Sequence, residues 1–168
     1  MSCPFPLERV LRRLLLPGAL LAAAASAVAA PPALPAFTAS TWRELQQSPQ
    51  RPLLVLFSSI DCVHCPTAID SLSAALGESR ARTRLVVVVM DGAGEEEALR
   101  ANPHYRRAQR LHVFAGDAMA LRHQIDPGWR GITPYVAMIP AAGAVHFHAG
   151  VPAAETVRDF MRRQEDAP

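Results

Sequence analysis

The sequence has no excess of either charge, and it contains no lysine. All 17 of its basic residues are arginine, against 15 acidic residues. Three of the arginines and one glutamate fall in the first 30 residues, so the remainder carries 14 residues of each sign. Proteins that bind nucleic acid or an anionic membrane surface present a basic face. We therefore expect no nucleic-acid partner, and no strong membrane binding by the part of the chain after residue 30.

Cysteine is also scarce, with Cys3 outside the candidate domain and one C-x-x-C pair, Cys62 and Cys65, inside it. A structural zinc ion takes four ligands, so the absence of a second C-x-x-C pair excludes a four-cysteine zinc site. A mixed site would need two histidines, and His146 and His148 could share one face of a strand. Their spacing is equally typical of the exposed side of an edge strand. We expect no resident metal and no cofactor.

Residues 1–29 have the pattern of a signal peptide. Three arginines precede an apolar run from Leu14 to Ala25, and Ala27-Val28-Ala29 matches the small-x-small motif for cleavage before Ala30. The alternative is an uncleaved membrane anchor, because the longer apolar stretch from Leu14 to Ala30, which has 17 residues, reaches the lower limit for crossing a bilayer. The pattern predicts a periplasmic protein, which would be membrane-anchored if the leader were retained.

The rest of the chain reads as a proline-rich linker, residues 30–39, and one α/β domain, residues 40–168. Apolar periodicity predicts strands at 53–57, 85–90, 111–115, 135–139 and 145–148, and helices at 42–47, 63–77, 95–110, 117–124 and 155–163. Ser40 or Thr41 is expected to cap the first helix, with Glu44 completing a capping box. Continuous apolar runs predict parallel strands covered on both faces, and the last two strands predict a hairpin around Ala142-Gly143.

The strand at 53–57 leads directly into Cys62-Val63-His64-Cys65-Pro66, where a helix is predicted to begin. Unpaired N–H groups at a helix N-terminus stabilise a thiolate, which is the reactive form of cysteine. With Cys62 at the cap and Cys65 one turn further, we expect Cys62 to be the nucleophile and Cys65 the resolving thiol. A disulfide between cysteines three apart closes too small a loop to stabilise the fold much. The pair therefore predicts redox catalysis.

Two neighbours of the first cysteine are expected to tune its thiolate. A protonated His64 would stabilise the Cys62 thiolate and make the disulfide more oxidising. Asp61 would act in the opposite direction, because a second negative charge disfavours the thiolate. An exposed histidine with no role is the simpler alternative for His64.

These residues resemble the thioredoxin-like superfamily over about residues 40 to 164. The features that carry the resemblance are the strand ending at Phe57, the Cys62-Val63-His64-Cys65 turn, and Arg130-Gly131-Ile132-Thr133-Pro134 before the hairpin. The resemblance implies a thioredoxin fold, which is a central mixed sheet flanked by helices. It also implies that Pro134 is a cis-proline packed against the active-site disulfide. The backbone of Thr133 would then bind a substrate peptide by strand addition.

The strand and helix expected between Leu111 and Gln124 resemble the insertion of the exported branch, of the TlpA and cytochrome c maturation type. The histidine in the C-x-x-C turn is similar to that of periplasmic disulfide oxidases, and Thr133-Pro134 to disulfide isomerases. Leu56 and Asp61 depart from thioredoxin itself, which has a buried acid and a tryptophan at these places. The direction of exchange therefore stays open between oxidase, reductase and isomerase.

The implied partners are protein thiols or disulfides, together with a membrane or periplasmic redox partner. Two other functions compete with this one. The cysteine pair and a histidine could bind copper in a chaperone, because soft thiolates suit Cu(I). Alternatively, the chain could be a non-catalytic binding domain with an inert disulfide.

Overall fold

A computed structural model describes residues 33–77 and 84–165; the predicted signal peptide and the first residues of the predicted linker lie outside this part. Six strands form one mixed sheet in the order β1-β4-β3-β2-β5-β6. In chain order they are β1 (Ala36–Phe37), β2 (Leu53–Ser58), β3 (Arg84–Val89), β4 (Arg110–Phe114), β5 (Tyr135–Ile139) and β6 (His146–Ala149). The strands β1, β4, β3 and β2 run parallel to one another, and β5 and β6 each run antiparallel to the strand before them in the sheet. The predicted α/β fold with a central mixed sheet is confirmed.

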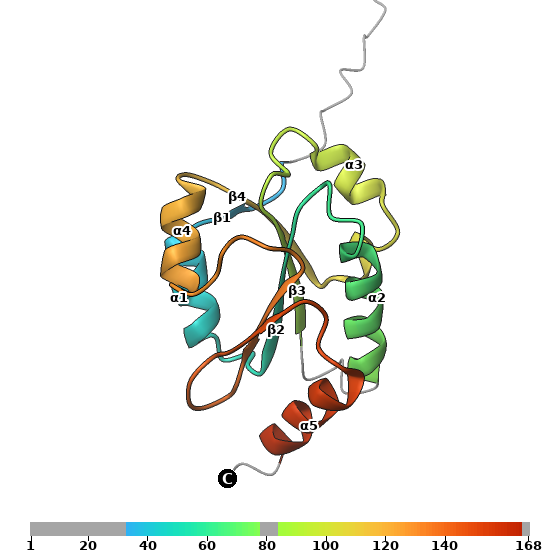
Figure 1. The fold of residues 1–168 in the computed structure, drawn as a ribbon, viewed down its shortest axis with the longest axis vertical. Helices are drawn as coiled ribbons and strands as arrows, with labels where there is room; N and C mark the ends of the chain where they lie inside the picture. The colour runs from blue at the N-terminus through green and yellow to red at the C-terminus, as the bar shows by residue number, and fades with distance from the viewer. Residues whose placement is uncertain (1–32, 78–83, 166–168) are drawn as a thin grey trace, which may run out of the picture. The chain divides into compact units, whose positions relative to one another are not determined.

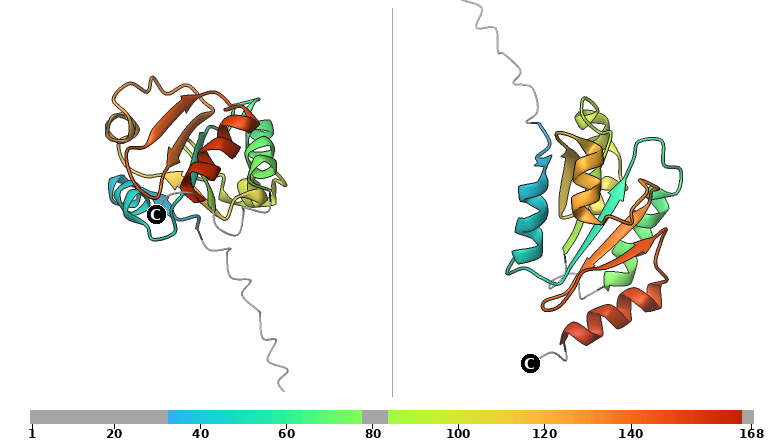
Figure 2. Two further views of the ribbon diagram at one scale, coloured as in Figure 1. Left: turned by 90° about the horizontal axis from the view of Figure 1, so that it is seen from below. Right: turned by 60° about the vertical axis from the view of Figure 1, so that its left-hand side comes forward.

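Helices cover both faces of this sheet (Figures 1 and 2). In chain order they are α1 (Ala39–Gln47), α2 (Cys65–Leu76), α3 (Glu96–Ala101), the 3-10 turn η2 (Tyr105–Arg107), α4 (Ala118–Ile125) and α5 (Ala154–Glu165). α1 and α4 lie side by side on one face, and α2 and α5 pack together on the other. No helix in residues 33–77 and 84–165 is long and apolar enough to span a membrane.

β2 is the centre of the sheet, and its six residues are all buried. Successive side chains of a strand point to opposite faces. Accordingly, Leu54 and Leu56 join the core beneath α2 and α5, while Val55 and Phe57 join the core beneath α1 and α4. Two filled cores fix β2 on both sides, so the position at which its chain leaves the sheet is well determined.

The start of the domain differs from the sequence-based prediction. Residues 36–37, which were predicted to belong to the linker, pair with β4, because Phe37 buries its ring completely against Phe57 and Phe114. Thr38, and not Ser40 or Thr41, is the N-cap of α1, and its capping box closes with Thr41 in place of Glu44. The helix therefore begins three residues earlier than predicted.

The predicted helix at 95–110 is also shorter in the structure. α3 ends at Ala101, and its C-cap Asn102 has an extended backbone. Pro103 follows, and a proline disfavours the helical conformation of the residue before it. The chain resumes as the short turn η2, which brings Tyr105 into the core.

His112 on β4 predicts a pH dependence of stability. Its ring is 7% exposed and lies edge-on to Phe37, and neither ring nitrogen forms a hydrogen bond with a described residue. Burial lowers the pKa of His112 from its usual 6.5, an effect that the nearby Ala36 carbonyl opposes only in part. At low pH the unfolded chain then binds a proton that the folded protein excludes. The contribution of His112 to the free energy of unfolding is therefore fully present above about pH 6.5 and is lost as the pH is lowered.

We expect His112→Leu to remove this dependence. The free energy of unfolding of the wild type, measured with denaturant between pH 7.5 and 5, should lose up to about 1.4 kcal/mol per pH unit from this one proton. The variant should show a shallower slope, whereas His123→Leu at an exposed position should keep that of the wild type. Equal slopes for the wild type and His112→Leu would contradict the assignment.

Candidate active site

The chain leaves β2 at Ser58 and reaches α2 through a tight loop, residues 59–64. The Cys62 N–H donates to the Ser59 carbonyl at 3.2 Å, and the Cys65 N–H donates to the Cys62 carbonyl at 3.1 Å. α2 begins at Cys65 with His64 as its N-cap, and no side chain caps this end. The helix therefore starts two residues later than predicted, and Cys62 lies just outside it rather than at the cap.

Cys62 and Cys65 form a disulfide whose two ends differ in exposure. Cys65 in the first turn of α2 is completely buried, whereas Cys62 in the loop is half-buried. Of the two cysteines, only Cys62 therefore leaves part of its surface open to a second molecule. Pro66 follows at the first turn, where the missing N–H removes no hydrogen bond of the helix.

Two polar contacts connect the end of β2 and the loop after it to residues farther along the chain. Ser58, fully buried, shares a hydrogen bond of 3.1 Å between its Oγ and the Tyr105 hydroxyl. The Ile60 N–H donates to Asp91 Oδ1 at 2.8 Å. Burial raises the pKa of Tyr105 although its hydrogen bond with Ser58 acts to lower it, and Asp91 adds to the rise, so the hydroxyl stays protonated. These contacts join the loop after β2 to the segments that follow β3 and α3.

A third contact joins the loop to the segment before β5. Ser59 Oγ and Thr133 Oγ1 lie 3.0 Å apart, and the Thr133–Pro134 peptide bond is cis. The Pro134 carbonyl accepts the Gly150 N–H at 2.9 Å. By contrast, the backbone N–H and carbonyl of Thr133 form no hydrogen bond within the described part of the chain. An edge of free backbone therefore lies next to the cysteine loop.

His64 and Pro134 line one pocket. It has a volume of about 350 Å³ and is completed by Thr67, Gly150 and Val151. The cysteine turn and Pro134, which are about 70 positions apart in the sequence, are thus neighbours. Asp61 is exposed on the loop. The structure therefore gathers the sequence-predicted residues Asp61, Cys62, His64, Cys65, Thr133 and Pro134 around one disulfide.

Exposed apolar side chains gather around this disulfide. Five large hydrophobic residues are exposed in the described part of the chain, and they are Ile60, Val63, Met119, Ile132 and Val151. Ile60 and Val63 belong to the cysteine loop, Ile132 precedes Thr133, and Val151 lines the pocket beside Pro134. Val63 is 80% exposed and Ile132 69%. Such a rim is typical of a surface that contacts another protein.

Sequence patterns did not point to the supporting residues Ser59, Asp91 and Tyr105. Each acts through a contact with a residue far along the chain, and short polar residues after a strand are common in loops. The aromatic cluster beside the site was also missed. Trp129 stacks on Tyr135 at a centroid distance of 4.7 Å, and the Tyr135 hydroxyl donates to Asp126. Burial and then Asp126 raise the pKa of Tyr135 well above its usual range.

The described residues contain no group of three His, Cys, Asp or Glu side chains placed to hold a metal ion. His146 and His148 lie on β6 at the edge of the sheet, with His146 exposed and its ring edge-on to Phe160. The cysteine pair and His64 thus do not form such a group.

No protein-family profile and no curated protein matches the chain. Solved structures are similar in fold. The exposed lipoprotein thioredoxin Etrx1 of Streptococcus pneumoniae is 13% identical over 71% of this chain and 89% of its own, with a TM-score of 0.52. Apo Sco1 of Thermus thermophilus is 15% identical over 71% and 82%, with a TM-score of 0.50. A secreted disulfide oxidoreductase of Mycobacterium tuberculosis is 14% identical over 68% and 82%, with a TM-score of 0.48. At such identities the similarity concerns the fold, and the chain has a thioredoxin-like fold.

Proposed function

We propose that the protein is a thiol–disulfide oxidoreductase in which Cys62 is the nucleophile and Cys65 the resolving thiol. The observation that carries the proposal is a disulfide between a half-buried and a fully buried cysteine, in a loop that is hydrogen-bonded to Thr133. A disulfide that served only the fold would have no need of an accessible end. The fold shared with Etrx1 supports the same chemistry.

In the reducing direction, the Cys62 thiolate attacks one sulfur of the partner's disulfide. The partner's S–S bond breaks, a mixed disulfide with Cys62 forms, and the departing sulfur takes up a proton. Cys65, as thiolate, then attacks the Cys62 sulfur and releases the second partner thiol. The partner gains two electrons and two protons, and the Cys62–Cys65 disulfide is formed again. The oxidising direction is the reverse, starting with attack of a partner thiolate on Cys62.

We propose that the substrate is a polypeptide that binds in an extended conformation. The free backbone of Thr133 can form main-chain hydrogen bonds with an added strand. The exposed side chains of Val63 and Ile132 offer apolar contacts to the residues that flank the partner's cysteine. This arrangement suits protein thiols and disulfides better than small thiols, which would use neither feature.

The thiolate of Cys62 is placed to receive two kinds of stabilisation. α2 begins three residues after Cys62, and its first-turn N–H groups carry partial positive charge. His64 lies between the two cysteines and can add a full charge when protonated, while the Asp61 carboxylate opposes it. We propose that these two side chains set the balance between thiol and thiolate, and with it the direction of exchange.

We further propose that the protein works in the periplasm. The leader pattern of residues 1–29 supports export, and so does the similarity in fold to an exposed lipoprotein. In an oxidising compartment, a membrane or periplasmic redox partner would return the cysteine pair to its active redox state after each exchange. Copper binding, the competing function, is less well supported, because no three ligand side chains of the described residues are placed to hold a metal ion.

Selective reactivity of Cys62 is the first test. After reduction, iodoacetamide should label Cys62 at least about tenfold faster than Cys65, because only the Cys62 sulfur is accessible and near free N–H groups. Mass spectrometry of the digested protein measures both rates. The Cys65→Ser variant should in addition accumulate a mixed disulfide with a disulfide-bonded peptide. Cys62→Ser should form none. Equal labelling of the two cysteines, or no mixed disulfide, would refute the proposal.

A matched pair of variants tests the tuning residues. His64→Ala should move the midpoint of the pH dependence of Cys62 alkylation to higher pH, because an imidazolium no longer stabilises the thiolate. Asp61→Asn should move it to lower pH, because a repelling carboxylate is gone. The iodoacetamide rate between pH 4 and 9 gives both midpoints, with His123→Ala as the control. Midpoints that do not move, or that move together, would show that neither side chain acts on the thiolate.

A further inference from the structure

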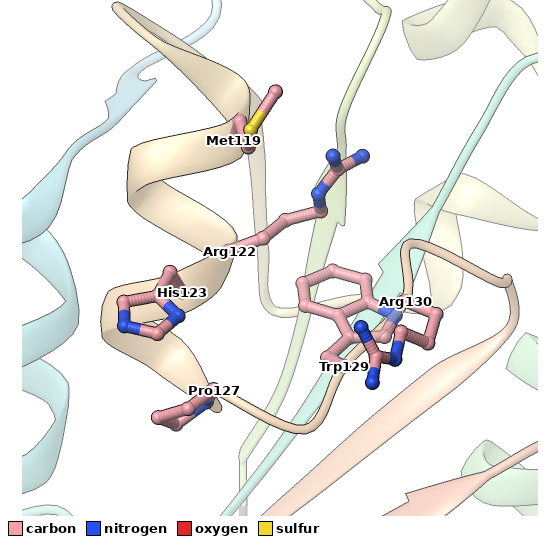
Figure 3. A pocket seen from close by; sticks show the side chains of 6 residues that line it. All are labelled: Met119, Arg122, His123, Pro127, Trp129 and Arg130. Atoms are coloured by element: carbon pink, nitrogen blue, oxygen red, sulfur yellow. The ribbon is translucent and has the colours of Figure 1, made fainter.

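A second pocket lies beside the segment that leads to Thr133, and it shares no lining residue with the pocket of His64. Figure 3 shows that it lies between α4 and the segment that leads to β5. Its volume is about 250 Å³, and its lining residues are Met119, Arg122, His123, Pro127, Trp129 and Arg130. This volume leaves room for a side chain and is below that of most pockets for whole small ligands. No lining residue is acidic.

Two guanidinium groups in this pocket lack a counter-charge. Within residues 33–77 and 84–165, the guanidinium groups of Arg122 and Arg130 form neither an ion pair nor a hydrogen bond. The nearest acidic side chain in the sequence, Asp126, is engaged elsewhere, because it accepts the Gly128 N–H and the Tyr135 hydroxyl. The lining of the pocket therefore contains two arginines and no acidic residue, although the domain as a whole is near neutral.

The pocket is firmly joined to the active-site segment. Trp129 is buried, packs against Phe57 and Tyr135, and donates its Nε1–H to the Ile132 carbonyl at 2.9 Å. Gly131 has a φ of +82°, and Arg122 Nη1 lies 2.7 Å from where a Cβ of residue 131 would be. The guanidinium of Arg122 thus occupies the space that the missing side chain leaves, and it faces the segment before Thr133.

We propose that Arg122 and Arg130 form a subsite for an acidic side chain of the partner polypeptide, a substrate preference that rests on the proposed function. A guanidinium is a planar fork of N–H donors that matches a carboxylate. Arg130 is three residues from Thr133, so the two lie within about 10 Å. A partner strand paired with Thr133 would reach the pocket with a Glu or Asp three to five residues from its cysteine.

A pair of peptides tests the preference through the exchange reaction. Two disulfide-linked peptides, blocked at both termini, differ only in having Glu or Gln four residues from the cysteine. The reduced wild-type protein should react with the Glu peptide about tenfold faster at low ionic strength, and 0.5 M NaCl should reduce this ratio towards one. Arg122→Glu/Arg130→Glu should reverse the preference, and Arg122→Gln/Arg130→Gln should abolish it.

The matched control is Arg158→Glu/Arg163→Glu, which makes the same change of charge at exposed positions of α5 on the other face of the sheet. It should keep the preference for the Glu peptide. A wild-type ratio of about one would overturn the subsite, and so would loss of the ratio in this control to the same extent as in the pocket variants.

Binding without chemistry separates the subsite from the redox proposal. Oxidised wild-type protein is titrated with cysteine-free Glu and Gln peptides while amide NMR spectra are recorded. The Glu peptide should shift the Trp129 indole N–H and the Gly131 amide at concentrations at which the Gln peptide does not. Equal shifts from both peptides would overturn the subsite. A protein that reacts with neither disulfide peptide, yet shows the Glu-specific shifts, would retain the subsite and refute the proposed function.

Discussion

The buried end of β2 determines where the disulfide lies. Ser58 is the last residue of the strand and is fully buried, and the strand packs into a core on each face of the sheet. The chain then continues into the loop of residues 59–64. Three hydrogen bonds then connect this region to distant parts of the chain. Ser58 at the end of β2 bonds to Tyr105, and the loop bonds to Asp91 and Thr133. Because the loop is held from several sides, Cys62 stays accessible while Cys65 is buried at the start of α2.

The two pockets that flank Thr133 along the chain have different chemistry. One is the apolar pocket of His64 and Pro134 beside the cysteine loop, where sulfur exchange is proposed to occur. The other contains Arg122, Arg130 and the indole of Trp129, and recognition of an acidic side chain is proposed there. Because Thr133 follows Arg130 and directly precedes Pro134, we propose that one extended partner segment contacts both.

Much of this arrangement could be predicted from local patterns. Apolar runs located β2 to β5 within one or two residues, and C-x-x-C after a buried strand located the disulfide. Element ends were predicted less well. Thr38 caps α1 in place of Ser40, and Pro103 ends α3 early. Burial of Phe37 places part of the proline-rich segment in the sheet. The contacts of Ser59 with Thr133 and of Tyr135 with Asp126 join residues whose meeting depends on tertiary packing, so no local pattern announces them.

The reduction potential of the Cys62–Cys65 pair tests the central claim most directly. Equilibration of the full-length protein with a series of dithiol and disulfide buffers, followed by trapping of free thiols, gives this value. An accessible, exchanging disulfide should have a potential between about −270 and −120 mV, the range of catalytic pairs. A potential below about −300 mV, together with a Cys62 that does not react with thiols, would identify an inert structural disulfide and contradict the proposed catalysis.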